Sequence, residues 1–258
     1  IMFRMKLGEG LFAFLHKMFG SIPAGLAMAS VIASAFMGAI TGVALAVIAI
    51  VGTMAYPEMK KRGYSERLST GMLASSSGLG ILIPPSLPMI LYGLITGDSI
   101  GRLFMAGVVP GIMITIFYCL YCSIAAALGI EKAPAAGKVS AAEKFAAFQK
   151  VWPSILLILV VLGGIYSGIM TPTEAAAVGC AGALFIAFLI GTLTWPNLKT
   201  SFMDATRASC AILMIVIGAR TFSYLVSVVG IPQHLAAWLV SLQAPPPFVM
   251  LIIMFILV

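Results

Sequence analysis

The stretch that decides the fold is Ser75-Ser76-Ser77-Gly78-Leu79-Gly80-Ile81-Leu82-Ile83-Pro84-Pro85-Ser86. It lies inside an apolar run, Leu73 to Ile95, that has the length of a membrane crossing. A proline removes a backbone donor and clashes with the preceding helical turn, so the pair predicts a helix that breaks near Ile83 and resumes after Ser86. In lipid such a break survives only where it is buried in protein or lines a polar cavity. Secondary transporters build their ion and substrate sites from broken helices of this kind.

Composition places the chain among polytopic membrane proteins. Of its 258 residues, 61% are hydrophobic and 9% are charged, against about 25% charged residues in soluble domains. The net charge of +7 does not indicate a nucleic-acid partner, because the basic residues cluster in short segments between apolar runs. The four cysteines lie in apolar segments and are expected to be small buried hydrophobic residues, not a disulfide framework. We therefore expect an all-α protein embedded in the lipid bilayer.

The almost uncharged run 21–57 is nearly twice as long as a spanning helix. Its middle, Gly38-Ala39-Ile40-Thr41-Gly42, is a natural turn. Two arms of about 16 residues would each reach only about 24 Å, short of a full crossing. This length favours a re-entrant helical hairpin with its tip near Thr41. The alternative is a single tilted helix with tolerated glycines.

The remaining segments are predicted from charge and hydropathy. Residues 1–20 predict an amphipathic interfacial helix, and the basic residues of 56–67 place that loop in the cytoplasm. The broken transmembrane helix then covers 68–96. Further crossings are expected over 103–129, 152–169, 173–194 and 208–229. A polar cytoplasmic stretch is expected over 130–151, and a short amphipathic helix over 196–207.

Three ionisable residues are weighed as candidates for function. Arg220 lies inside the last crossing, where a charge is a functional hypothesis by default, although a position near the helix end or a structural ion pair would also explain it. Glu174 follows Thr171-Pro172 and is explained by helix capping, with a coupling role as the alternative. His16 on the amphipathic helix is expected to be part of a polar face.

A weak internal repeat relates the two ends of the chain. A shift of 224 residues places Leu11 on Leu235 and gives residues 5–20 and 229–244 the same amphipathic character. The first copy carries lysines, whereas no Lys or Arg occurs between 221 and 258, so the positive-inside bias gives the two copies opposite orientations. Inverted repeats are typical of transporters. On this alignment the second hairpin would lie beyond Val258.

Three motifs closely resemble the large membrane (M) subunit of tripartite ATP-independent periplasmic (TRAP) transporters. They are the serine-rich break continued by Leu87-Pro88-Met89-Ile90-Leu91-Tyr92-Gly93, the segment Pro57-Glu58-Met59-Lys60-Lys61-Arg62-Gly63-Tyr64, and the segment Ile165-Tyr166-Ser167-Gly168-Ile169-Met170-Thr171-Pro172-Thr173-Glu174-Ala175-Ala176-Ala177. The resemblance extends over essentially the whole chain, and we expect the chain to be such a subunit truncated at both ends.

The resemblance implies a multi-pass protein of the bacterial inner membrane that imports organic acids, such as C4-dicarboxylates or sialic acid, by a sodium-driven elevator mechanism. It implies two partners, a small membrane (Q) subunit and a periplasmic substrate-binding protein. The transport domain would include 21–101, mainly scaffold helices would follow in 102–195, and connecting arms would lie at 1–20 and 196–207. Residues 208–258 would begin an incomplete second repeat. The family's Ser-Gly-Ser-type tip is not matched, because Val43 follows Gly42.

Sodium prefers oxygen ligands, and hydroxyls with unwound carbonyls supply them without a buried carboxylate. We expect the resumed half-helix near Ser86 to offer N–H groups to a substrate carboxylate. The alternative is that Ser and Gly serve only close helix packing. The candidate sodium and substrate site comprises Gly38, Ala39, Thr41, Gly42, Ser75, Ser76, Ser77, Gly78, Gly80, Pro84, Pro85 and Ser86.

Two rival functions are weighed against this hypothesis. A single-component sodium–dicarboxylate symporter would carry similar hairpins. An intramembrane enzyme would need a catalytic constellation, but the sequence has no HExxH motif, no paired intramembrane Asp and no Ser/His pair. We expect no catalytic residues and no organic cofactor, with Na+ as the coupling ion.

Overall fold

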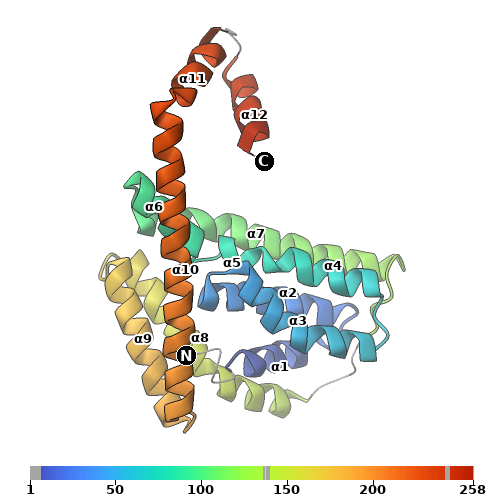
Figure 1. The fold of residues 1–258 in the computed structure, drawn as a ribbon. Helices are drawn as coiled ribbons and strands as arrows, with labels where there is room; N and C mark the ends of the chain where they lie inside the picture. Colours follow the sequence, from blue (N-terminus) through green and yellow to red (C-terminus); the bar gives the residue numbers. More distant parts are fainter. Residues whose placement is uncertain (1–6, 136, 138–139, 242–244, 258) are drawn as a thin grey trace. The chain divides into compact units, whose positions relative to one another are not determined.

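The structure, a computed structural model, describes residues 7–135, 137, 140–241 and 245–257, and no strand occurs within these ranges (Figure 1). The expected all-α fold is thereby confirmed. The first six residues of the expected helix 1–20 lie outside the described part. The chain divides into two compact units, Ile1–Ser201 and Phe202–Val258. The described helices are α1 Leu7–Phe19, α2 Gly25–Thr41, α3 Ala44–Lys61, α4 Glu66–Ser77, α5 Leu79–Leu82, α6 Leu87–Thr96, α7 Ile100–Ala127, α8 Ala141–Tyr166, α9 Pro172–Leu189, α10 Trp195–Val228, α11 Ile231–Ser241 and α12 Pro246–Leu257.

Within the described residues, four helical segments are long and apolar enough to cross a membrane. They are the interrupted segment Glu66–Thr96 and helices α7, α9 and α10. Helix α8 adds a fifth if its two parts, which meet at 54°, are taken as one span. Pro153 explains the bend, because it cannot donate to the carbonyl of Gln149 one turn earlier. The protein is therefore a multi-pass membrane protein.

The run 21–57 forms two helices, α2 and α3, which lie side by side (Figure 1). The chain reverses at Gly42, whose φ of 65° is open to glycine at little cost, and at the extended Val43. Two helices therefore replace the alternative of a single tilted one. Helix α3 continues to Lys61, past the expected end at 57. An ion pair of 2.8 Å between Arg62 and Glu58 stabilises its last turn.

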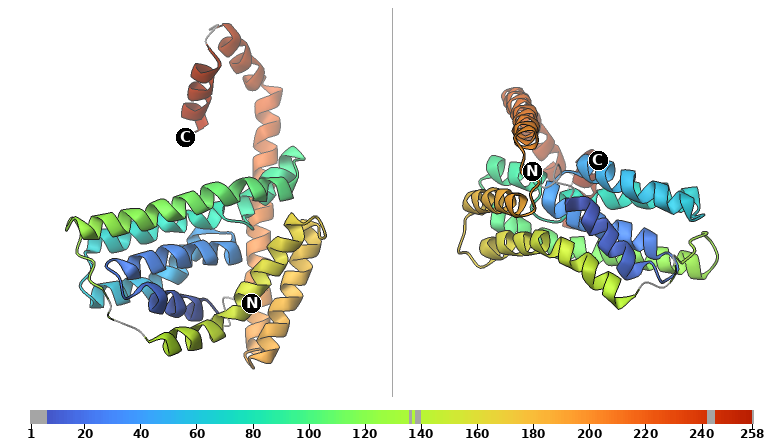
Figure 2. Two further views of the ribbon diagram at one scale, coloured as in Figure 1. Left: turned by 180° about the vertical axis from the view of Figure 1, so that it is seen from behind. Right: turned by 90° about the horizontal axis from the view of Figure 1, so that it is seen from below.

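The main hydrophobic core lies among α1, α2, α3 and α4, around fully buried residues such as Val31 and Val51. Helix α7 packs along α2, α4, α5 and α6 (Figures 1 and 2). Glycines make this contact close: a Cβ at Gly107 would lie 2.6 Å from the Leu82 carbonyl oxygen, and one at Gly111 would lie 2.7 Å from the Ile83 side chain. Helix α7 thus packs closely against the break through these glycines.

The segment after α7 forms a clasp, Glu131–Ala133, across the base of the hairpin. Its carbonyls accept hydrogen bonds from the amides of Ala24 at 2.9 Å and Ser65 at 2.8 Å. The Ser65 hydroxyl donates to the Glu131 carboxylate and also caps α4 by accepting from the Leu68 amide. The clasp therefore joins the starts of α2 and α4 through main-chain bonds.

Helices α8 and α9 form an antiparallel pair, and α8 also packs on α1, where the buried Val151 joins the main core (Figure 2). Helix α9 begins with a capping box, in which Thr171 Oγ1 accepts from the Glu174 amide at 3.3 Å and Glu174 Oε2 accepts from the Thr171 amide at 2.8 Å. The structural explanation of Glu174 is confirmed.

The second unit contains most of α10, with α11 and α12. The amphipathic helix expected at 196–207 is not a separate element, since it is the beginning of the 34-residue α10. No Gly or Pro occurs between Asn197 and Ile217, so nothing ends the helix, and Pro196 is tolerated in its first turn. Helix α11 falls within the predicted amphipathic segment 229–244.

Candidate functional site at the hairpin tip and helix break

The last turn of α2 lies directly on the backbone of the broken helix. A Cβ added at Gly38 would lie 2.7 Å from the Gly80 Cα and 3.1 Å from the Leu79 carbonyl oxygen. A Cβ at Gly80 would in turn lie 2.8 Å from Val47 of α3. Gly80 is therefore enclosed between the two arms of the hairpin, where a larger residue would have to displace the Val47 side chain.

One helical turn later, Gly42 makes the second contact. A Cβ at this position would lie 2.8 Å from the Pro85 carbonyl oxygen, and the carbonyl of Gly42 accepts a 3.2 Å hydrogen bond from the Leu87 amide. The hairpin tip is thus joined to the point where the broken helix resumes. The structure brings the predicted residues Gly38, Gly42, Gly80 and Pro85 together.

Unpaired carbonyl oxygens accumulate at this junction. Pro84 and Pro85, whose peptide bond is cis, have no N–H to donate to the carbonyls of Gly80 and Ile81 four residues earlier. The buried hydroxyl of Ser86 compensates at Ile81, donating to its carbonyl at 2.5 Å. Within the described residues, the remaining carbonyls of the break and the end of α2 accept no hydrogen bond, namely Gly80, Leu82, Ile83, Pro84 and Pro85 with Ala39, Ile40 and Thr41. Hard cations are bound by oxygen ligands, and these carbonyls are uncharged oxygen ligands.

Amide donors are distributed differently from the sequence-based expectation. At the start of α6, the Leu87 amide is used by Gly42 and Pro88 has none, so in the described structure Met89 is the unpaired amide of the first turn. The start of α3 has more: the amides of residues 44–46 have no partner in the described residues, and no side chain caps the helix. An anion would therefore find more donors at α3, next to the tip, than at α6.

The serines of the break differ in their surroundings. Ser76 is fully buried and its hydroxyl lies 3.0 Å from that of Ser34 on α2, below the tip. Ser77 donates to its own helix, at the Ala74 carbonyl, and the Thr41 hydroxyl likewise donates to the Met37 carbonyl at 2.8 Å. These groups fix the local backbone.

One predicted residue of this unit is not brought to the tip. Ser75 is exposed on another face of α4, toward α7. Arg220 lies on α10 in the second unit, with an exposed side chain. Gly78, between α4 and α5, is half-buried and belongs to the backbone of the break.

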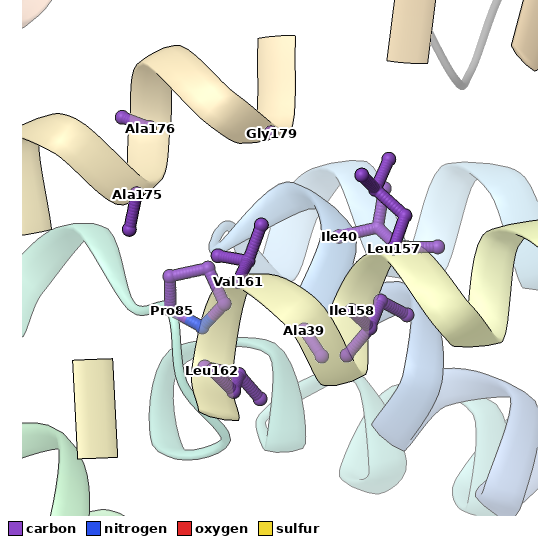
Figure 3. A pocket seen from close by; sticks show the side chains of 10 residues that line it. All are labelled: Ala39, Ile40, Pro85, Leu157, Ile158, Val161, Leu162, Ala175, Ala176 and Gly179. Carbon is purple, nitrogen blue, oxygen red and sulfur yellow. The ribbon is translucent and has the colours of Figure 1, made fainter. Parts of the chain in front are cut away.

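An apolar cavity of about 200 Å³ adjoins the junction (Figure 3). Ala39, Ile40 and Pro85 line one side, and residues of α8 and α9, including Val161 and the small Ala176, line the other. The hairpin tip therefore meets the α8–α9 pair through loosely packed apolar surface.

Comparison with known proteins decides the family. The model of the family described as "Tripartite ATP-independent periplasmic transporter, DctM component" matches residues 1–258. The chain belongs to this family. This confirms the resemblance seen in the serine-rich break and its two companion motifs.

Several DctM-component relatives are clearly similar. The chain is 34% identical over 248 residues to the C4-dicarboxylate TRAP transporter large permease protein DctM of Pseudomonas aeruginosa, covering 96% of this chain and 58% of that protein. It is 35% identical over 239 residues to the ectoine TRAP transporter large permease protein TeaC of Halomonas elongata, covering 90% and 54%. It is 30% identical over 247 residues to the sialic acid TRAP transporter large permease protein SiaM of Vibrio cholerae, covering 95% and 57%. The chain thus spans little more than half the length of these relatives, which are named as transporters and not as enzymes.

The arrangement in this DctM-component chain suits a cation held by uncharged oxygens. Within the described residues, no group of three or more His, Cys, Asp or Glu side chains could hold a metal ion. Sequence analysis missed the amides of α3 and the buried Ser34. A signal for Ser34 existed, since Ser30 and Ser34 lie one turn apart in an otherwise apolar helix, a spacing that marks one face.

Proposed function

We propose that this chain forms the sodium- and carboxylate-binding half of a TRAP-type permease. One observation carries the proposal: at the hairpin tip, a helix end rich in unpaired carbonyls lies a few residues from a helix start with unpaired amides. The carbonyl end of α2 and the break favour a cation, and the amino end of α3 favours an anion. Carbonyls of Gly80, Pro85 and Thr41 are the first candidates to hold Na+.

The packing supports an elevator mechanism in which the hairpin and broken helix move together against α8 and α9. The clasp and the Gly38–Gly80 contact join α2, α3 and α4 into one body, whereas the α8–α9 pair meets Pro85 across a cavity and packs on this body mainly through α1. We include α7 in the moving body, because it packs on the break, although the resemblance assigned 103–128 mainly to the scaffold. Residues 208–258 would begin the second, inverted repeat.

The relatives support the substrate class and the partners. Their names specify a C4-dicarboxylate, sialic acid and ectoine, all of which carry a carboxylate. The permease would act in the bacterial inner membrane with a small membrane subunit and a periplasmic substrate-binding protein, and the loop 56–67 would face the cytoplasm. One relative is named as a fused DctMQ permease, which favours this arrangement over a single-component symporter.

The test is uptake by the full-length permease, reconstituted with its small subunit. Candidate organic acids are supplied with the binding protein under an inward sodium gradient, an inward potassium gradient, or a proton gradient alone. We expect uptake with sodium and binding protein together, and little without either. Equal uptake under the proton gradient would refute sodium coupling, and equal uptake without binding protein would favour the single-component symporter.

A further inference from the structure

A second groove, which carries several polar side chains, lies away from the hairpin tip, between α4 and α7. It encloses about 340 Å³, and Arg67, Ser75, Tyr118 and Tyr121 contribute its polar side chains. Gly71 deepens it, since a Cβ at this position would meet nothing within 4 Å. The glycine is therefore not required by packing within the described structure, unlike Gly38 or Gly80.

The polar groups of this groove are unsatisfied. Within the described residues, the guanidinium of Arg67 and the hydroxyls of Ser75, Tyr118 and Tyr121 make no hydrogen bond or ion pair. Neighbouring hydroxyls on α4 behave differently, since Thr70 donates to the Glu66 carbonyl at 2.8 Å. Polar groups that face a membrane without partners are costly, so an occupant that accepts hydrogen bonds is indicated.

The combination of chemical groups in the groove indicates that occupant. Arg67 is the second residue of the span Glu66–Thr96 and so lies at a membrane–water interface. Ser75 lies eight residues further along α4, about 12 Å deeper at 1.5 Å per residue. The groove therefore combines a cation at the interface with hydroxyls and with an apolar wall that includes Leu68 and Met72, and these groups match the phosphate, the ester carbonyls and the first part of an acyl chain of a phospholipid.

We propose that the α4–α7 groove binds one anionic phospholipid, with its phosphate on Arg67. The guanidinium pairs with phosphate oxygens through charge-assisted hydrogen bonds, and the tyrosines lie where membrane proteins favour them, near the headgroups. A free phosphate would leave the deeper hydroxyls and apolar wall unused. The site lies on a different face of α4 from the buried Ser76 and Ser77.

The experiment measures lipid binding to the delipidated full-length permease by native mass spectrometry. Phosphatidylglycerol and phosphatidylcholine of equal chain length are titrated separately. Arg67→Gln should weaken phosphatidylglycerol binding about tenfold, and Gly71→Leu should abolish it by filling the groove. Lys61→Gln, which removes an exposed charge at the end of α3, should bind as the unmodified protein does. Gly71→Leu replaces a poor helix former by a good one at a position where a Cβ meets nothing within 4 Å, so we expect folding to be maintained.

Three outcomes would overturn the proposal. The first is unchanged binding in both Arg67→Gln and Gly71→Leu. The second is equal affinity for phosphatidylcholine, which would show that the groove does not select an anionic lipid. Displacement of the lipid by inorganic phosphate alone would likewise overturn the proposal, because it would identify a free-anion site. The third is a cross-link from a Ser75→Cys variant to another segment of the full-length permease, which would show that protein covers the groove.

Discussion

Replacing Gly38 by alanine tests the contact on which the candidate site depends. The new Cβ would lie 2.7 Å from the Gly80 Cα, whereas ordinary contact begins at 3.4 Å, so the two backbones must separate by 3.4 − 2.7 = 0.7 Å. Overpacking of this kind costs about 1–3 kcal/mol. Alanine returns about 1 kcal/mol through its higher helix propensity. The net loss of stability is therefore small, about 0–2 kcal/mol, and the protein should still fold.

The displacement matters more for the site, because Gly42 and the carbonyls of α2 move with Gly38. A misplacement near 1 Å can cost about a hundredfold where several groups must converge. We expect sodium activation of uptake by the reconstituted full-length permease to weaken about tenfold or more. Gly52→Ala is the matched control, since a Cβ there meets nothing within 4 Å. Unchanged sodium activation in Gly38→Ala would refute the argument that this contact positions the tip.

Three further predictions concern stability and exchange. Ser86→Ala leaves the Ile81 carbonyl unpaired and should cost about 1–3 kcal/mol in the free energy of unfolding; a loss below about 0.5 kcal/mol would contradict the bond. Burial, and after it the charge of Arg62, lowers the pKa of His16 below 6.5. As the pH falls, the unfolded chain therefore binds a proton at this residue before the folded chain does. The contribution of His16 to the free energy of unfolding should thus be complete above pH 6.5 and decrease as the pH drops below it, and His16→Gln should remove this dependence. An identical slope of melting temperature against pH in the two proteins would argue against this role of His16. Glu131→Ala should speed deuterium exchange at the Ser65 amide, whereas Glu131→Gln retains an acceptor and should not; equal rates would show that the carboxylate does not hold the clasp.

The hairpin turn and the helix break were predictable because Gly and Pro act locally. Gly42 permits a positive φ, and Pro84 and Pro85 remove donors whatever surrounds them. The apolar pattern likewise gave the multi-pass class. These features need no knowledge of which helices meet.

The rest depends on contacts between distant segments. The sequence places Ser75, Ser76 and Ser77 side by side, but successive helical residues point 100° apart, so Ser76 meets α2 while Ser75 faces α7. Nothing local links Glu131 to Ser65, which lie 66 residues apart in the sequence. Packing determines these outcomes.

The carbonyl-rich junction predicts how the proposed sodium and carboxylate sites affect one another. The resumed half-helix was expected to supply amides to a carboxylate, but Leu87 donates to the hairpin and Pro88 has no N–H, so the junction presents mainly carbonyl oxygens. The partial negative charges of these oxygens repel a carboxylate until a bound cation offsets them. The amides at the start of α3 then attract the carboxylate. Sodium should therefore bind first and strengthen substrate binding, and substrate must strengthen sodium binding by the same factor. Calorimetric titration of the full-length permease in sodium and in potassium would measure that factor, and equal substrate affinity in both salts would show that the tip does not couple the two ligands.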